Sequence, residues 1–298
     1  HKPIYEQIID AINNDGVLDP SFSLPDEKPD KEIKFAPGAW DGVMIYHMGH
    51  GDFDPENEEY KSLVKIIKIA FKGNIDRAIE DAERFSISGY ILPHIDNLLN
   101  YIISHETELQ SGNVMMLGYR LMVEGHKKET VKLGLAILEL FDTNQSEDFK
   151  EPIRTLALCD EFSFYAGFNM RSWEEGNEEL FAAIKKVYGW GRIHLIHMLE
   201  AETEEMKLWL LKNGVHNEVT PAYSGLDCYE KTDFISHLKR PLNHDLYSGM
   251  SDIIAALLDE GPVAGISAIN EGEEVLQLFI DVTSKRKDLQ ATDYGTIL

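Results

Sequence analysis

Apolar residues recur at intervals of three and four along most of this chain, and glycine and proline stand mainly between the periodic stretches. Such spacing places apolar side chains on one face of an α-helix, whereas runs of alternating β-branched residues, typical of strands, are nearly absent. The pattern predicts an all-α protein. The expected helices include the ranges 4–12, 38–47, 55–71, 92–103, 113–123, 129–141, 153–170 and 192–199.

Polar residues mark where some of these helices should begin. Asp54, Pro55 and Glu56 have the order of an N-cap, a proline at the first helical position and an acidic first turn, and Asn74 is expected to open the next helix. The stretch 19–34 combines three prolines with many charges and predicts a surface arm. We therefore divide the chain into an irregular N-terminal arm with short helices, residues 1–54, and one continuous α-helical repeat domain, residues 55–298.

From residue 113 onward a unit recurs that consists of an apolar helix, a short polar break and a second helix that opens with Glu. These openings include Glu129, Glu178, Glu204 and Glu273. One helix pair cannot bury its apolar face alone, so neighbouring pairs stack into a continuous core. The range 74–282 resembles the HEAT and armadillo class of helical repeats, which implies stacked antiparallel helix pairs in a curved α-solenoid. An irregular all-α globule is the alternative fold.

The charge of the chain narrows its possible partners. Lys and Arg number 28 against 52 Asp and Glu, which gives a formal net charge of −24. Nucleic acids and anionic membrane surfaces are bound through Lys and Arg, so neither is an expected partner. A DNA-glycosylase branch of the helical-repeat class would need a basic concave face, the opposite of this composition. The charge instead favours a basic protein partner.

The cysteines and the missing motifs limit the chemistry further. Cys159 and Cys228 lie in apolar stretches and are expected to be reduced core residues, which excludes a disulfide scaffold. The opening residues lack a signal-peptide pattern and no apolar run is long enough to span a membrane, so we expect a cytoplasmic protein. No phosphate loop or dinucleotide fingerprint is present, and no cofactor is predicted.

The range 156–170 is apolar and aromatic, yet Asp160 and Glu161 stand in its middle. A buried carboxylate needs a partner or a cavity, and Arg154 and Arg192 are candidate partners. Asp160, Arg192 and Tyr223 follow one another at intervals of 32 and 31 residues, each close to one helix pair, so a shared groove is expected. An inter-helix salt bridge or an exposed helix edge is the structural alternative. The predicted ligand-groove residues are Asp160, Glu161, Asn169, Trp190, Arg192, Asn217 and Tyr223.

Three further residues form a candidate metal site. His194, His197 and Glu200 follow one another at intervals of three, which places both imidazoles on one helix face and the carboxylate at its edge. Two imidazoles and a carboxylate can bind iron or zinc. The structural alternative is that Trp190 fills a groove between repeats, Arg192 caps backbone carbonyls and the histidines are ordinary polar edges of an inner helix.

A second group, His47, His50 and Asp52, offers a similar set of metal-binding atoms. A calcium loop that starts at Asp52 is excluded, because Asn57 stands where the loop needs Gly and Leu63 where it needs a bidentate Glu.

Helical-repeat arrays mostly act as binding surfaces, because stacking generates a long concave face. The resemblance and the acidic charge together predict a protein-binding, scaffold or inhibitor module for a basic partner. The alternative is an enzyme that acts on a small molecule in a groove lined by His, Glu, Asp and Arg, with or without a metal ion.

Overall fold

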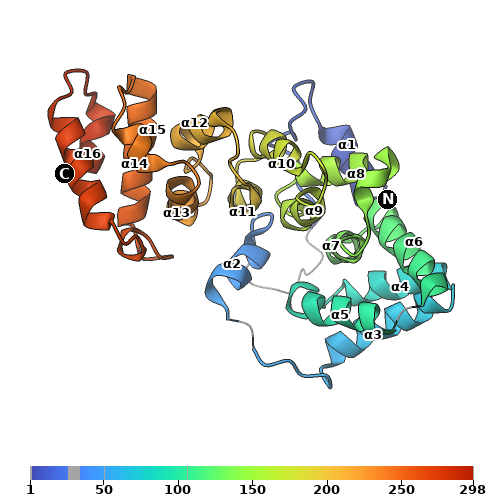
Figure 1. Cartoon of the computed structure of the whole chain (residues 1–298). Helices are drawn as coiled ribbons and strands as arrows, with labels where there is room; N and C mark the ends of the chain where they lie inside the picture. The colour runs from blue at the N-terminus through green and yellow to red at the C-terminus, as the bar shows by residue number, and fades with distance from the viewer. Residues whose placement is uncertain (1, 26–33, 50, 106, 298) are drawn as a thin grey trace.

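The computed structural model describes residues 2–25, 34–49, 51–105 and 107–297 (Figure 1). Within these ranges the regular structure is helical, and the only β-type pairing is one isolated bridge between Ile12 and Leu18. The predicted all-α class is confirmed. None of the described helices combines the length and the apolar composition that crossing a membrane requires.

The helices follow closely from the apolar spacing of the chain. In order they are α1 (Ile4–Ala11), α2 (Ala39–His47), α3 (Glu58–Phe71), α4 (Ile75–Phe85), α5 (Ile95–His105), α6 (Glu108–Glu124), α7 (Lys128–Leu138), α8 (Glu147–Ala157), α9 (Ser163–Met170), α10 (Gly176–Ile184), α11 (Trp190–Met198), α12 (Glu204–Asn213), α13 (Ala222–Glu230), α14 (Phe234–Leu238), α15 (His244–Leu258), α16 (Gly272–Ser284) and α17 (Tyr294–Ile297). Short 3₁₀ turns lie at Leu92–His94, Thr143–Gln145, Ile266–Ala268 and Ala291–Asp293.

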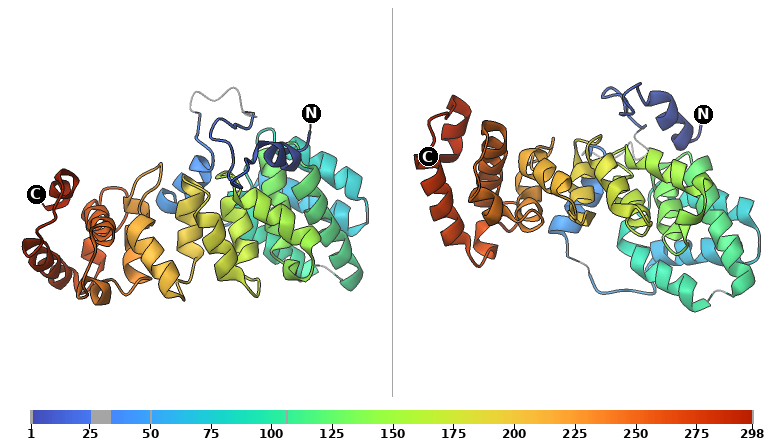
Figure 2. Two further views of the ribbon diagram at one scale, coloured as in Figure 1. Left: turned by 90° about the horizontal axis from the view of Figure 1, so that it is seen from above. Right: turned by 45° about the horizontal axis from the view of Figure 1, so that its top comes forward.

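The helices are arranged along an elongated molecule in chain order. Figure 2 shows the colours running in sequence from the cyan and green helices at one end to the red helix α16 at the other. Helices that are neighbours in sequence also pack together, as in α6 with α7, α8 with α9, α10 with α11 and α12 with α13. Packing also joins alternate helices, such as α9 with α11 and α11 with α13.

Several predicted helix limits are wrong; the helix expected at 113–123, for example, spans Glu108–Glu124. Two of these errors have a clear local cause. The helix at 55–71 begins at Glu58 instead of Pro55, because the Asn57 side chain caps it by accepting bonds from the N–H groups of Glu59 and Tyr60. The single helix expected at 153–170 is two helices, α8 and α9, joined by a turn at 158–162. Apolar residues continue through that turn because it is packed inside the protein, so the periodicity did not reveal it.

We call the helices from α3 to α17 the array. Helix α7 is its most buried helix, and every residue from Glu129 to Leu138 is shielded from solvent. It packs closely against α6, since a Cβ atom at Gly134 would meet backbone atoms of Met122 and Gly118. A side chain at Gly134 would therefore force the two helices apart. A charged residue in α7 must find its partners inside the protein.

The N-terminal arm crosses the array. Helix α1 packs on α6 and α8, and α2 lies beside α11 and α13 (Figure 1). The chain then returns through residues 51–57 to α3 at the end of the molecule (Figure 1). This path places the arm against loops that lie far from it in sequence.

Candidate functional site

Helix α2 approaches the array through two glycines. Gly38 has a positive φ of 73°, and a Cβ there would meet the backbone of Asp160. Gly42, one turn later, lies against the ring of Trp190, and a Cβ at this position would overlap that ring. The missing side chains let the α2 backbone lie directly on the array. This close approach brings Asp41 into the protein interior.

Asp41 meets a buried ammonium group surrounded by carboxylates. Lys132 Nζ lies 2.8 Å from Asp41 Oδ2, 3.0 Å from Glu129 Oε1 and 2.6 Å from Glu161 Oε1. Lys132 and Asp41 are each 2% exposed and Glu129 is 3% exposed. The three carboxylates come from α2, from α7 and from the turn between α8 and α9. We call these four residues the Lys132 cluster.

Backbone donors complete the Lys132 cluster. Glu129 Oε2 accepts a bond of 2.9 Å from the N–H of Ile91, and Glu161 Oε2 accepts one of 2.9 Å from the N–H of Gly38. Asp41 differs from these two, because neither of its oxygens has a partner at hydrogen-bond geometry among the described residues. It contacts Lys132 through the ion pair of 2.8 Å. The arm is held by one ion pair and one hydrogen bond at this point.

The charges of the Lys132 cluster shift the pKa values of its members. Burial raises the pKa of Asp41 to about 6, and the neighbouring Glu129 and Glu161 carboxylates act in the same direction against the attraction of Lys132. Burial alone would lower the pKa of Lys132, but the three carboxylates outweigh it and hold that pKa well above its ordinary value. Burial opposes ionisation of Glu161, yet the Lys132 charge keeps its pKa low. The repulsion among the three carboxylates therefore makes Asp41 take up a proton more readily.

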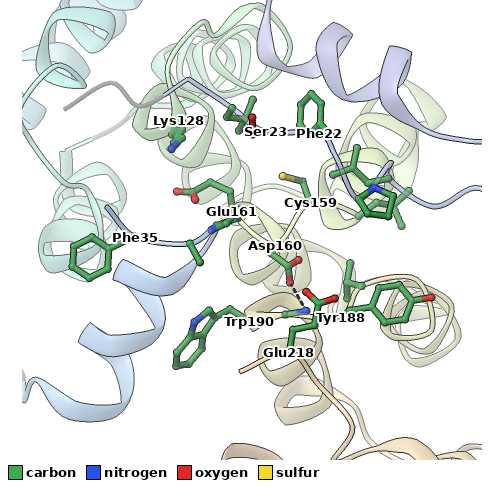
Figure 3. Close-up of a pocket in the computed structure, with 18 of the residues that line it drawn as sticks. Phe22, Ser23, Phe35, Lys128, Cys159, Asp160, Glu161, Tyr188, Trp190 and Glu218 are labelled. Atoms are coloured by element: carbon green, nitrogen blue, oxygen red, sulfur yellow. Dashed lines mark hydrogen bonds between the residues drawn. The ribbon is translucent and has the colours of Figure 1, made fainter. Parts of the chain in front are cut away.

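A cavity of about 850 Å³ lies between the arm and the array. Its walls are the arm segments 17–24 and 34–37, the start of α7, and the loops 158–161, 186–190 and 218–219. Figure 3 shows Glu161 and Asp160 on the array side of this cavity, with Phe22, Ser23 and Phe35 of the arm around them. We call it the arm cavity. Its volume lies in the range typical of small-molecule pockets.

Asp160 lines the arm cavity and also organises the start of α11. Its Oδ1 accepts bonds of 3.1 Å from the N–H of Gly189 and 2.6 Å from the N–H of Gly191. Burial raises the pKa of Asp160 to about 6, and the negative charge of Glu218 adds to the effect, although the two backbone donors oppose it. Asp160 is thus an N-terminal cap whose carboxylate lies beside a second carboxylate.

Trp190 and Tyr223 lie together, as the predicted groove requires. Their ring centroids are 4.9 Å apart, and Tyr46 of α2 packs 5.0 Å from Tyr223. The hydroxyl of Tyr223 is hydrogen-bonded to Nε2 of His47. Trp190 lines the arm cavity, whereas Tyr223 lies outside its lining and receives the end of α2. The rings of Trp190 and Tyr223 form the apolar surface against which α2 packs.

The guanidinium of Arg192 binds backbone carbonyls inside the array. Its Nε donates to the carbonyl of Val187 at 2.7 Å and its Nη1 to the carbonyl of His216 at 2.8 Å. Its guanidinium also lies over the rings of Tyr188 and Trp209. Burial lowers the pKa of this guanidinium. Arg192 is not among the residues that line the arm cavity, and its donors hold two loops in place.

The two predicted asparagines also have local partners. Asn169 Nδ2 donates to the carbonyl of Leu135 at 2.9 Å, deep between α9 and α7. Asn217 Nδ2 donates to the carbonyl of Thr220 at 3.2 Å, while its Oδ1 accepts from the N–H of Val219. Neither residue lines the arm cavity. The structure thus brings Asp160, Glu161 and Trp190 to one cavity and leaves the other four groove residues outside it.

The candidate metal ligands point to different surroundings. His194 is buried among the rings of Tyr46, Phe164 and Trp190, and this burial lowers its pKa to about 3. His197 is exposed and pairs with Asp227 at 3.1 Å, a contact that raises its pKa.

Glu200 lies beyond the end of α11, where its N–H donates to Asn177. Within the described part of the chain, no group of three or more His, Cys, Asp or Glu side chains is placed to hold a metal ion.

The second candidate metal group is only partly described. His50 lies outside the described residues. His47 contacts Tyr223 through its ring nitrogen, and Asp52 is exposed. His47 therefore helps to hold the end of α2 against α13.

The sequence did not point to the Lys132 cluster as a site. Asp41 was hidden in a short helix of the arm, and Lys132 and Glu129 were hidden in the apolar pattern of α7. A charged pair three residues apart on a helix that is otherwise apolar is the signal that would have found them.

Comparisons of the chain with protein-family models, with curated proteins and with solved structures found no match. The function of the chain therefore has to be inferred from its own geometry and charge.

Proposed function

We propose that this chain is a protein-binding module for a basic partner, built as a HEAT- or armadillo-like stack of antiparallel helix pairs. The observation that carries the proposal is an acidic edge formed where α8, α10 and α12 begin. A repeating array would place equivalent helix ends on the same side, so the charges of successive units would add along one edge.

Two contacts support the alignment of these helix starts. Arg154 donates to Glu147 of α8 at 2.6 Å and to Glu179 of α10 at 2.7 Å, so both first turns lie within the reach of one guanidinium. Asn177, at the start of α10, accepts a bond of 3.0 Å from the N–H of Glu200, shortly before α12. The starts of α8 and α10, and those of α10 and α12, are therefore neighbours.

The edge carries more acids than its own cations can balance. Arg154 is occupied by Glu147 and Glu179, and Lys207 is paired with Asp233. The exposed acids of this edge are Glu147, Asp148, Glu174, Glu175, Glu178, Glu202, Glu204 and Glu205. Glu147 pairs with Arg154, and Glu204 pairs with His237 and Arg240, while the other six acids form no ion pair among the described residues. A row with this excess of negative charge attracts a cationic protein at long range and selects against acidic ones.

Affinity capture from the cells that make this protein tests the proposal. The triple variant E178Q/E202Q/E205Q removes three exposed charges that form no ion pair within the described part of the chain, and E273Q/E274Q/D245N removes three exposed charges outside the edge as a matched control. We expect one basic partner that binds the wild type and the control alike, binds the edge variant more weakly, and is released by salt. A partner without excess positive charge, or one that binds all three proteins equally, would contradict the proposal.

A small-molecule enzyme is the second candidate, and the arm cavity is the observation in its favour. The cavity has enough volume for a substrate and contains Asp160, Glu161 and Trp190. Two other residues of that hypothesis support it less, because the donors of Arg192 are bound to carbonyls and His194 is enclosed by aromatic rings. Binding is therefore the better-supported role.

A further inference from the structure

The arm cavity contains five carboxylates, and three of them are already engaged. Glu129 and Glu161 belong to the Lys132 cluster, and Asp19 accepts bonds from the backbone and hydroxyl of Ser21. Asp160 and Glu218 are different. Among the described residues, neither of these two forms an ion pair with a Lys, Arg or His side chain.

Asp160 and Glu218 lie together at the lower wall of the cavity. Figure 3 shows the carboxylate of Glu218 beside Asp160, with Tyr188 and Trp190 to either side. The backbone N–H of Glu218 donates to the carbonyl of Tyr188 at 2.7 Å, which holds the two loops side by side. Two carboxylates that approach one another in a partly desolvated site repel each other unless a cation or a proton lies between them.

Among the described residues, none of the lysines that line the cavity forms an ion pair with Asp160 or Glu218. Lys34 and Lys128 belong to this lining, and the charge of Lys128 acts on Glu161. Lys132 Nζ is surrounded by its three carboxylates, and Lys186 Nζ extends toward Gly16 of the arm. Arg192 is close enough for its charge to act on Asp160, but its Nε and Nη1 donate to carbonyls. The ring of Tyr188, which is 45% exposed, offers an aromatic surface for a further cation next to the carboxylates.

We infer that the arm cavity is a binding site for an organic cation, whose guanidinium or ammonium group lies between Asp160 and Glu218. A guanidinium presents several N–H donors in one plane and can serve both carboxylates at once. The group can come from a free amine or from a side chain of a basic protein. Only the second source rests on the proposed function, because the cavity and the acidic edge are separate features.

The proton equilibrium of Asp160 provides a signature of such binding. Its pKa of about 6 means that a substantial fraction of the carboxyl groups is protonated in mildly acidic solution. A bound cation favours the ionised form, so binding should release protons and become tighter as the pH rises through this value. Glu218, Arg192 and the N–H groups of Gly189 and Gly191 are the other groups that face Asp160.

Isothermal titration calorimetry with three small probes tests the inference without any protein partner. N-acetyl-arginine amide carries the guanidinium, spermidine represents a free amine, and N-acetyl-citrulline amide is an uncharged isostere of the first. We expect one-to-one binding of a cationic probe at millimolar concentration or below and no binding of the citrulline compound. Tighter binding of spermidine would indicate a free amine, and tighter binding of the arginine compound would indicate a side chain.

The variants D160N and E218Q locate the site. Each should weaken binding by about tenfold or more, as expected when one charge-assisted contact is lost. D160N should also abolish the pH dependence, whereas E274Q on α16 removes an exposed charge elsewhere and should bind like the wild type. Glu218 is exposed, so E218Q remains informative even if D160N impairs folding at the start of α11.

The inference is overturned if neither cation binds, if the citrulline compound binds equally well, or if E218Q retains wild-type affinity. Any of these results would leave the proposed acidic edge untouched, because that proposal depends on a protein partner and on other residues. Conversely, loss of partner binding in E178Q/E202Q/E205Q would not bear on the affinity of the arm cavity for these small probes.

Discussion

Asp41 of the N-terminal arm lies 2.8 Å from Lys132 in the most buried helix of the array. This ion pair joins α2 to α7, and Glu161 joins the same ammonium to the turn between α8 and α9. The arm is therefore attached through a charge that the interior of the array provides. The stability of this attachment depends on the balance between one ammonium group and three carboxylates.

Replacing Lys132 by Met should destabilise the protein by about 3–5 kcal/mol, because three buried carboxylates lose the ammonium group that they share. The exposed lysine in K68M provides a control that loses the same charge and should unfold like the wild type. Urea denaturation measures both. Adding D41N to K132M should restore part of the loss, since it removes one stranded charge. A K132M protein as stable as wild type would show that the cluster does not hold the arm.

The pH dependence of stability should reveal Asp41. Its pKa is about 6 in the folded protein and close to the ordinary aspartate value when unfolded, so the folded state binds the proton more tightly. The corresponding stability is present below the unfolded pKa and is lost as the pH rises through about 6. Between about pH 5 and pH 7.5 the wild type should lose roughly 1.4 kcal/mol relative to D41N.

Urea unfolding of both proteins at these two pH values and constant ionic strength measures this difference. Asp160 and His194 titrate in both proteins, so their effects cancel in the comparison. If the difference in the free energy of unfolding between wild type and D41N does not change with pH, the pH dependence does not come from Asp41.

The close approach of α2 to Trp190 predicts a different response at two glycines of the arm. G42A adds a methyl group where the Trp190 ring lies, and it should weaken the attachment by about 1–3 kcal/mol. Gly49 has nothing within 4 Å of the same position, so G49A should be neutral. Limited proteolysis of the arm together with Trp fluorescence compares them. Equal protease resistance of both variants would argue against this packing.

Cys159 should report whether the arm is in place. Its thiol is 4% exposed under the arm, and burial raises its pKa to about 12, so it should react very slowly with a disulfide reagent. In a C228A background, K132M and G42A should accelerate this reaction, whereas K68M should not. Cys159 that reacts equally fast in all these proteins would indicate that the arm does not shield it.

Arg192 should behave as a structural residue. R192A leaves the carbonyls of Val187 and His216 without their donor and removes the cation from the rings of Tyr188 and Trp209, so a loss of about 2–4 kcal/mol is expected. R192K keeps the charge but cannot reach both carbonyls with one ammonium group, and it should recover only part of the loss. Thermal unfolding measures both variants. Unchanged stability in R192A would instead favour a role in binding.

The sequence predicted the helices better than it predicted the site. Apolar spacing indicated most helices because each depends on residues a few positions apart. Asp160 and Glu161 were correctly recognised as costly in an apolar stretch, but their surroundings depend on a turn at 158–162 that apolar residues conceal. The partner of Glu161 is Lys132 of α7 instead of Arg154 or Arg192, because the choice of partner depends on how helices pack.

The candidate metal residues show the same limit. His194 and His197 are three residues apart on α11, yet the first faces aromatic rings and the second faces Asp227. Spacing along a helix places side chains on one side, but it cannot say which neighbouring elements meet them. Those neighbours come from α2, α9 and α13, and how these helices pack on α11 is not defined by any local pattern in the chain.

The route of the arm has a consequence for the order in which the molecule folds. His47 contacts Tyr223 across 176 positions of the chain, whereas most helices contact near neighbours. Closing so long a loop carries an entropic penalty that short-range helix packing avoids, so the helices should assemble first and the arm should dock last. Once docked, the arm links α7, α11 and α13 into one cooperative block. Helices α15–α17 lie away from the arm (Figure 1), so their amide hydrogens should exchange sooner than those of α7, α11 and α13.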